Sequence, residues 1–355
     1  MTMRAALLGI LLVASISAVS TAAFAQTAMP ETAPEGVLAV AVLGLADGTA
    51  DGSGAEKVLP IVREEAAKRW RLLDDEQVRG VLREHRIRSL ASLDQEDGAR
   101  IAEATGAEAL LLGSVILYQE GENPEIAVAL RLLAPSDLRV IAAASAASSG
   151  LDHASLFEIG RVRDPDLLAR DVVREAIARL AACLDGKRTG PTQGRIAIVP
   201  FDGSPQDPQD GPLVSDLLLP VLFAHGYDIV EPGLLRRLFE RLHVAPRGGI
   251  DLETLRALRE DLAIDLAITG EVDEAVESQG DAQMAMPRLA YGVRLVDART
   301  GHLFQAIEEQ TGGERRAGLL PLGWTTSLGR LVEESLDRLV AKIEEQPRED
   351  HASRR

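Results

Sequence analysis

The sequence predicts an α/β protein that contains two tandem copies of one domain, each a mixed β-sheet with helices packed on it. The main observation is a stretch that occurs twice, at Ala104–Val115 and at Asp261–Val272. Its glycines, Gly113 and Gly270, are 157 positions apart, and the alignment continues without a gap over about 45 residues. A period this long indicates a duplicated domain rather than a short solenoid repeat.

Further pairs support the duplication. The same offset aligns Trp70 with Tyr227 and Asp94 with Asp251. Beyond the repeated stretch the offset becomes 163, which aligns Arg131 with Arg294. Copy two therefore has about six extra residues, which we place in the loop 276–287.

The second observation is the alternation of short apolar runs with segments of helical periodicity, which predicts the order β-α-β-α-α-β-β-β-α in each copy. In copy one we expect strands at 37–43, 70–73, 108–117, 125–134 and 138–147, and helices at 56–69, 75–85, 94–104 and from 164 onward. In copy two we expect strands at 195–200, 227–230, 265–275, around 294 and at 303–309, and helices at 212–225, 232–242, 251–261 and 328–343.

Local signals justify several of these elements. Asp94, Asp251 and Asp164 are good N-cap residues for the helices that follow them. We expect Leu167 and Leu168 to lie on the buried face of the helix that begins after Asp164. The first strand–helix–strand unit favours parallel neighbours, and the later hairpins favour antiparallel pairing. The short linker between the copies allows the two sheets to lie side by side.

The N-terminus predicts export. Residues 1–25 contain a positive charge, an apolar run and the small residues Ala23 and Ala25, which is typical of a signal peptide cleaved after Ala25. No cysteine follows that site to accept a lipid, so we expect a periplasmic protein without a lipid anchor or a membrane span. The remaining parts are a flexible leader at 26–35, copy one at 36–185, a linker at 186–193, copy two at 194–346 and a disordered tail at 347–355.

Composition excludes several classes of function. The formal net charge of −17 disfavours nucleic acid and anionic lipid as partners, because both require a basic surface. The single cysteine, Cys183, rules out an intramolecular disulfide and a paired-cysteine metal site. A redox role for Cys183 stays open.

No motif predicts catalysis, a cofactor or a metal. The glycine-rich stretch around Gly52 lacks the Gly-Lys-Ser/Thr of a phosphate loop. A calcium loop at 202–210 is disfavoured, because Pro205 and Pro208 interrupt the ligand spacing and no closing glutamate follows. For Arg131 and Arg294, a structural contact to a helix end or a neighbouring acid is favoured over a ligand contact.

The candidate binding residues lie in loops that differ between the copies, where divergence and binding concentrate. For Trp324, at the start of the last helix, a hydrophobic staple and an interface anchor are both open. The possible partner-binding residues are Asp202, Asp207, Asp210, Glu277, Asp281 and Trp324.

Four phrases in copy two carry a family resemblance: 195–201 (RIAIVPF), 227–231 (YDIVE), the repeated segment 262–272, and 293–301 (VRLVDARTG). Together they resemble the domain shared by the curli secretion protein CsgG, the penicillin-binding-protein activator LpoB and the N-terminal domain of TolB. In copy one, Ala134–Leu138 replaces the Asp-Ala-Arg-Thr-Gly turn. The loop at 276–287 shows no apolar alternation long enough for the membrane hairpins of a CsgG-like pore.

The resemblance implies a non-enzymatic envelope protein that works by binding other proteins, so we expect a periplasmic adaptor or scaffold. Two alternatives stay open. One is a ring-forming component of an envelope assembly or secretion system, and the other, less favoured, is a small-molecule-binding protein.

Overall fold

The computed structural model describes residues 37–87, 93–152, 160–186, 194–245, 248–277, 286–313 and 325–345. Each copy contains the predicted order of nine elements. Copy one has β1 (Ala39–Asp47), α1 (Gly54–Ala67), β2 (Arg71–Leu72), α2 (Asp75–Glu84), α3 (Gln95–Thr105), β3 (Ala109–Gln119), β4 (Glu125–Leu133), β5 (Val140–Ser149) and α4 (Pro165–Asp185). Copy two has β6 (Arg195–Ile198), α5 (Asp210–Ala224), β7 (Asp228–Ile229), α6 (Pro232–Leu242), α7 (Leu252–Leu262), β8 (Leu266–Val276), β9 (Arg288–Asp297), β10 (Leu303–Gly312) and α8 (Leu328–Glu345).

The two sheets have the same topology, which confirms the predicted fold class. Sheet A has the strand order β2-β1-β3-β4-β5, and sheet B has β10-β9-β8-β6-β7. The first pairs, β1–β2, β1–β3, β6–β7 and β6–β8, are parallel, and the hairpins that follow are antiparallel.

The strand registers match residue by residue. In sheet A, Arg131 lies between Leu112 and Ala143. In sheet B, Arg294 lies between Thr269 and Ala306. The offset is 157 on β8 and 163 on β9 and β10, so the six extra residues of copy two fall between β8 and β9, as predicted.

The helix caps follow the predicted signals. Asp94 accepts a hydrogen bond from the backbone N–H of Asp97, and the Asp97 side chain completes a capping box. Asp251 accepts from Glu253 and Thr254 at the start of α7, and Asp164 caps α4. The prediction for Leu167 is wrong: the residue is 56% exposed, while Leu168 is fully buried and packs with the core.

The repeated glycines are required by close packing. A methyl group on Gly113 would stand 2.5 Å from the carbonyl oxygen of Ala129, and one on Gly270 would stand 2.4 Å from the ring of Phe201. Trp70 and Tyr227, the aligned aromatic residues before β2 and β7, are both buried.

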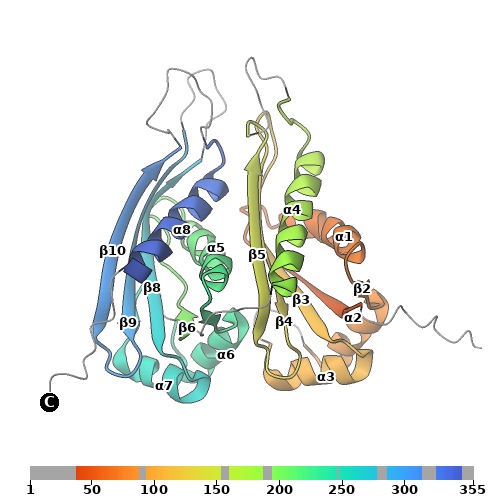
Figure 1. Cartoon of the computed structure of the whole chain (residues 1–355), viewed down its shortest axis with the longest axis horizontal. Helices are drawn as coiled ribbons and strands as arrows, with labels where there is room; N and C mark the ends of the chain where they lie inside the picture. The colour runs from red at the N-terminus through yellow and green to blue at the C-terminus, as the bar shows by residue number, and fades with distance from the viewer. Residues whose placement is uncertain are drawn as a thin grey trace, which may run out of the picture. The chain divides into compact units, whose positions relative to one another are not determined.

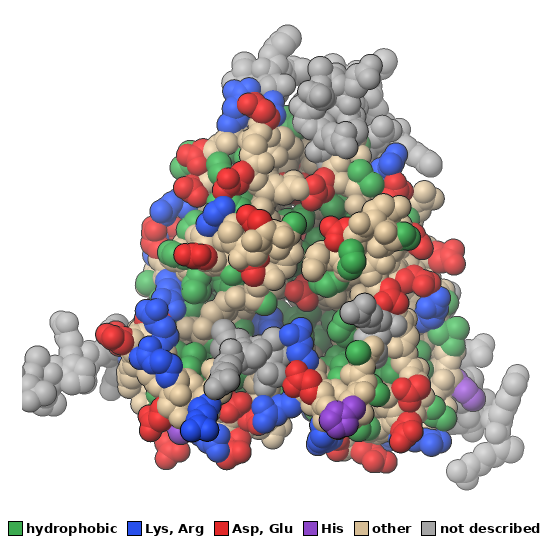
Figure 2. All heavy atoms as spheres, turned by 180° about the vertical axis from the view of Figure 1, so that it is seen from behind, with side chains coloured by type: hydrophobic (Ala, Val, Ile, Leu, Met, Phe, Trp, Pro, Cys, Tyr) green, Lys and Arg blue, Asp and Glu red, His purple; other side chains and the backbone are tan. Residues whose placement is uncertain are grey.

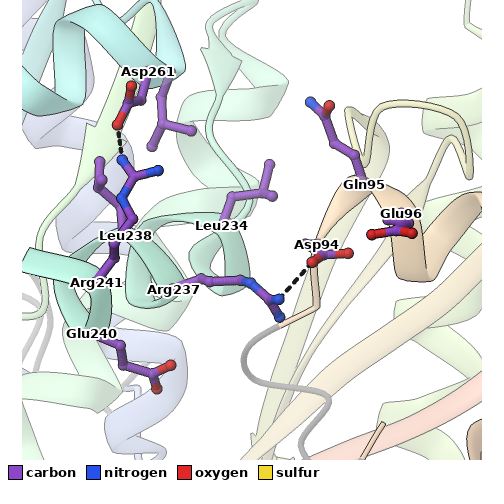
Figure 3. Close-up of a pocket in the computed structure, with 10 residues that line it drawn as sticks. Asp94, Gln95, Glu96, Leu234, Arg237, Leu238, Glu240, Arg241 and Asp261 are labelled. Atoms are coloured by element: carbon purple, nitrogen blue, oxygen red, sulfur yellow. Dashed lines mark hydrogen bonds and ion pairs between the residues drawn. The ribbon is translucent and has the colours of Figure 1, made fainter. Parts of the chain in front are cut away.

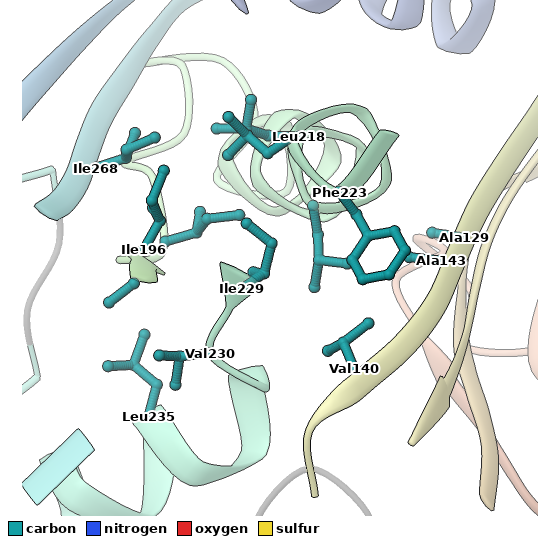
Figure 4. Packing of buried hydrophobic residues seen from close by; sticks show 14 of the residues in the cluster. Ala129, Val140, Ala143, Ile196, Leu218, Phe223, Ile229, Val230, Leu235 and Ile268 are labelled. Carbon is teal, nitrogen blue, oxygen red and sulfur yellow. The ribbon is translucent and has the colours of Figure 1, made fainter. Parts of the chain in front are cut away.

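The copies are joined by helices rather than by sheet edges, which the sequence did not predict. One face of sheet A is covered by its own α1 and α4, and the other face packs against α5 and α8 of copy two. These two helices also pack on sheet B, so they form a layer between the sheets (Figure 1). Figure 4 shows Phe223 of α5 directed toward Ala129 and Ala143 of sheet A.

Small side chains on β4 and β5 allow this close approach. Gly329 of α8 lies against Ala127 and Ala147, and a methyl group at Gly329 would stand 2.9 Å and 2.7 Å from their Cβ atoms. Contacts this short do not occur between real side chains, so α8 or the sheet must shift to accept one.

We therefore predict that Gly329→Ala destabilises the protein by about 1–3 kcal/mol, because it overpacks the layer between the sheets. Gly80, in α2, is the matched control, since a methyl group there would meet nothing within 4 Å. Gly80→Ala should stabilise by about 0.5–1 kcal/mol through helix propensity. Urea denaturation of both variants measures the difference, and equal midpoints would contradict this packing.

Candidate functional site

The contact between the copies contains buried charged groups that the fold must satisfy. Arg131 of β4 donates two hydrogen bonds to Glu231, from Nε to Oε2 at 2.7 Å and from Nη2 to Oε1 at 2.8 Å. The Glu231 side chain is only 1% exposed, and Glu231 is also the N-cap residue of α6. This confirms the structural role predicted for the repeated arginines, because Arg294 pairs with its neighbour Glu271.

A second buried acid fixes the start of α8. Glu125, the first residue of β4, is fully buried and accepts hydrogen bonds from Ser327 Oγ at 2.9 Å and from the backbone N–H of Gly329 at 3.0 Å. Burial raises the pKa of Glu125 to about 8, and the nearby Glu277 and Asp152 carboxylates add to that shift.

Thr326 bonds to the same part of copy one. Its hydroxyl oxygen lies 2.7 Å from Ser149 Oγ, and Thr326 donates to Asp152 through its hydroxyl at 2.7 Å and its backbone N–H at 3.2 Å. Glu125, Ser149 and Asp152 of copy one thus hold the segment of copy two that begins α8. Copy one supplies the polar partners that this helix start would otherwise take from water.

Two of the hollows among the described residues are lined by residues of both copies. The larger, of about 730 Å³, lies between α3 and α6 and is lined by charged side chains that pair with one another. There Arg237 bonds to Asp94 at 2.6 Å, and Arg241 pairs with Asp261 (Figure 3). The Arg237–Asp94 pair joins the two copies at this hollow, while the Arg241–Asp261 pair lies within copy two.

The second hollow, which we call the cleft, has a volume of about 440 Å³. Copy one contributes Gly48–Asp51 and the end of β3, and copy two contributes Gln206–Asp210, the end of β8 and Leu328. Figure 2 shows a furrow between the two halves of the described surface, with acidic, basic and hydrophobic side chains along it.

The polar loop before α5 is held in a defined conformation beside the cleft. Ser204 Oγ accepts hydrogen bonds from the backbone N–H groups of Gln206 and Asp207, and Asp207 Oδ1 accepts from the N–H of Gln209 at 2.8 Å. Gly211 is required at the end of this loop, because a Cβ there would stand 2.2 Å from the carbonyl oxygen of Phe201. The loop thereby places Asp207 and Asp210 at the cleft.

Asp210 is the least satisfied acid of the cleft. Its residue is 9% exposed, and its Oδ2 atom has no hydrogen-bond partner among the described residues. Ser204 hydrogen-bonds to the Asp210 side chain, but burial and the nearby charges of Asp207 and Glu277 raise the pKa of Asp210. Glu277, at the end of β8, accepts a hydrogen bond from the side chain of Gln119 of copy one.

The structure brings together three of the six candidate residues, namely Asp207, Asp210 and Glu277. Asp202 lies outside the lining of the cleft, and its backbone extends sheet B through a bridge to Glu271. Asp281 and Trp324 lie outside the described residues.

Sequence reasoning missed the contribution of copy one, which supplies Asp51, Tyr118 and Gln119. The sequence could have indicated Asp51, because the 157-residue offset aligns the loop 48–51 with residues 205–208 of the polar loop in copy two. Tyr118 donates a hydrogen bond to Asp166 at 3.3 Å, and burial together with the Asp166 charge raises its pKa to about 12.

In the part of the chain that the structure describes, no group of three or more histidine, cysteine or acidic residues is arranged to hold a metal. No helix within the same described ranges is long and apolar enough to cross a membrane.

Comparison with solved structures finds several bacterial proteins that resemble less than half of this chain at low sequence identity. The PelC dodecamer from Paraburkholderia phytofirmans is 15% identical, with a TM-score of 0.31, over 44% of this chain and 94% of that chain. Lipoprotein GNA1162 from Neisseria meningitidis is 17% identical, with a TM-score of 0.30, over 41% and 96%. The LpoB C-terminal domain from Salmonella enterica is 11% identical, with a TM-score of 0.27, over 35% and 86%. No family model and no curated protein matches the sequence.

Proposed function

We propose that this protein is a non-enzymatic periplasmic adaptor that binds other cell-envelope proteins through the cleft between its two copies. The observation that carries the proposal is the convergence at the cleft of loops from both copies, including the polar loop that distinguishes copy two. The rigid layers of helix and sheet hold these loops in position, as scaffolds of binding loops do.

A photo-crosslinking amino acid placed at two exposed glutamines tests this proposal in cells. Gln209 lines the cleft, and Gln310 lies on β10, so the two sites are chemically matched. We expect crosslinks to identified envelope proteins from position 209, and reconstitution of the same contact with the purified partner. No crosslink from position 209, or the same products from both positions, would exclude the cleft as the binding site.

Ring formation is the second candidate, and one observation favours it. The copies pack head to tail, with α5 and α8 on sheet A, and such heterologous contacts can propagate into a ring. The equivalent face of sheet B would be the next contact surface.

The side chains on this face of sheet B favour an adaptor over a ring. The row Ser114–Ala129–Ser145, which lies at the contact between the copies, corresponds in sheet B to Glu271–Gly292–Glu308. Glu308 is exposed and the Glu271 side chain is 46% exposed, so a neighbouring helix layer would have to desolvate two carboxylates. We therefore expect light scattering after gel filtration to give the mass of one chain at all concentrations. A stable higher mass would instead support the ring.

A further inference from the structure

The cleft is lined by one sign of charge. Its carboxylates are Asp51, Asp207, Asp210 and Glu277, and the described lining contains no lysine, arginine or histidine. Lys57 lies beside it, with its Nζ 4.8 Å from the centroid of the Tyr118 ring, but this ammonium pairs with Glu120 at 2.8 Å. The cleft carboxylates thus gather negative charge in a partly enclosed space, which attracts cations.

Asp210 shows that this charge is incompletely compensated inside the protein. Nine-tenths of the residue is buried, its Oδ2 has no described partner, and it faces the charges of Asp207 and Glu277. A buried carboxylate oxygen without a donor is costly, and a positively charged donor compensates that cost best.

The rest of the wall suits a long side chain. Tyr118, Leu213, Val276 and Leu328 line the same cleft and offer apolar surface next to the carboxylates. Lysine and arginine combine a charged head with an apolar stem, so they match a wall of this mixed character. The volume of about 440 Å³ lies within the range of sites that take small ligands and side chains.

We propose that the cleft receives a lysine or arginine side chain from a basic segment of the partner protein. Asp210 and Glu277 bind the cationic head, and Tyr118 with Leu213 contacts the stem. This inference rests on the proposed adaptor function and specifies the chemistry of the partner.

Isothermal titration of the purified protein with short capped peptides tests the inference. The probes are a peptide of alternating alanine and lysine, and the same peptide with norleucine in place of lysine. We expect the lysine peptide to bind with an affinity that falls as salt is added, and the norleucine peptide to bind at least about tenfold more weakly. Equal binding of the two peptides, or binding of neither, would overturn the proposal.

Two double variants test whether the lysine peptide binds at the cleft. Asp210→Asn with Glu277→Gln should weaken the lysine peptide about tenfold or more. Glu271→Gln with Glu308→Gln removes the same charge from the face of sheet B and should leave the affinity unchanged. Asp210→Asn could lower stability, because Asp210 is buried at the start of α5. Glu277→Gln alone then still tests the proposal, because Glu277 is not buried at a helix start. Retained affinity in the cleft variants would overturn the proposal.

Two further results separate this inference from the adaptor function. If spermidine binds as tightly as the lysine peptide, the cleft is a binding site for a small cation, and the proposal of a peptide side chain fails. If crosslinking from position 209 depends on the cleft carboxylates while the lysine peptide does not bind, the adaptor function stands and only the cationic side chain is wrong.

Discussion

Arg131→Met is expected to destabilise the protein by about 3–5 kcal/mol, because it leaves the Glu231 carboxylate buried without its bidentate partner. Glu231 is 1% exposed and Arg131 is 15% exposed at the side chain, so water can replace little of the lost interaction. The loss is measured as the change in the free energy of unfolding in urea at neutral pH.

Copy two contains the matched control. Arg294 occupies the same register position as Arg131, but its pair with Glu271 is exposed, at 47% and 46% of the two side chains. Arg294→Met should therefore cost about 0–1 kcal/mol. Combining Arg131→Met with Glu231→Leu should recover much of the stability, since it removes both charges of the pair. Equal costs for Arg131→Met and Arg294→Met would show that the buried pair does not hold the copies together.

Glu125→Gln is expected to remove a pH dependence of stability. The folded protein raises the pKa of Glu125 to about 8, compared with 4.5 for a free glutamate, so between these values the folded state holds a proton that the unfolded state releases. Stability from this group is complete below pH 4.5 and is lost as the pH rises toward 8, by at most about 1.4 kcal/mol per pH unit.

The glutamine variant isolates this effect. Its side-chain oxygen can still accept from Ser327 and Gly329, while no proton can be lost. We expect the variant to gain stability relative to the parent as the pH rises from 5 to 8, measured by urea unfolding at each pH. Glu122→Gln, at an 83% exposed side chain, should follow the parent curve. Parallel curves for all three proteins would refute the buried state of Glu125.

Much of the fold follows from local sequence signals. The aspartates before α3, α4 and α7 predict those helix starts, because each side chain accepts hydrogen bonds from the first turn. The change of offset from 157 to 163 locates the insertion between β8 and β9. These features need only neighbouring residues or a comparison of the two copies.

The arrangement of the copies could not be predicted in the same way. The helix α5 is buried almost throughout, which distinguishes it from the amphipathic α1, but an apolar sequence does not say which surface will cover it. The partner of Arg131 is 100 positions away, and many acids are equally distant in sequence. Long-range contacts of this kind depend on packing rather than on local pattern.

For the same reason, only part of the candidate site could be predicted from the sequence. Loop divergence indicated Asp207, Asp210 and Glu277, since these residues lie in segments that copy one lacks or changes. The opposite wall, with Tyr118 and Gln119, becomes visible only once β3 and β8 end at the same cleft.

Photo-crosslinking from Gln209 in three backgrounds tests the central claim most directly, namely that envelope proteins bind at the cleft. The backgrounds are the parent, Asp210→Asn with Glu277→Gln, and Glu271→Gln with Glu308→Gln. The account predicts that the yield of the crosslinked envelope partner falls about tenfold only in the cleft background. The same yield in all three backgrounds would contradict it.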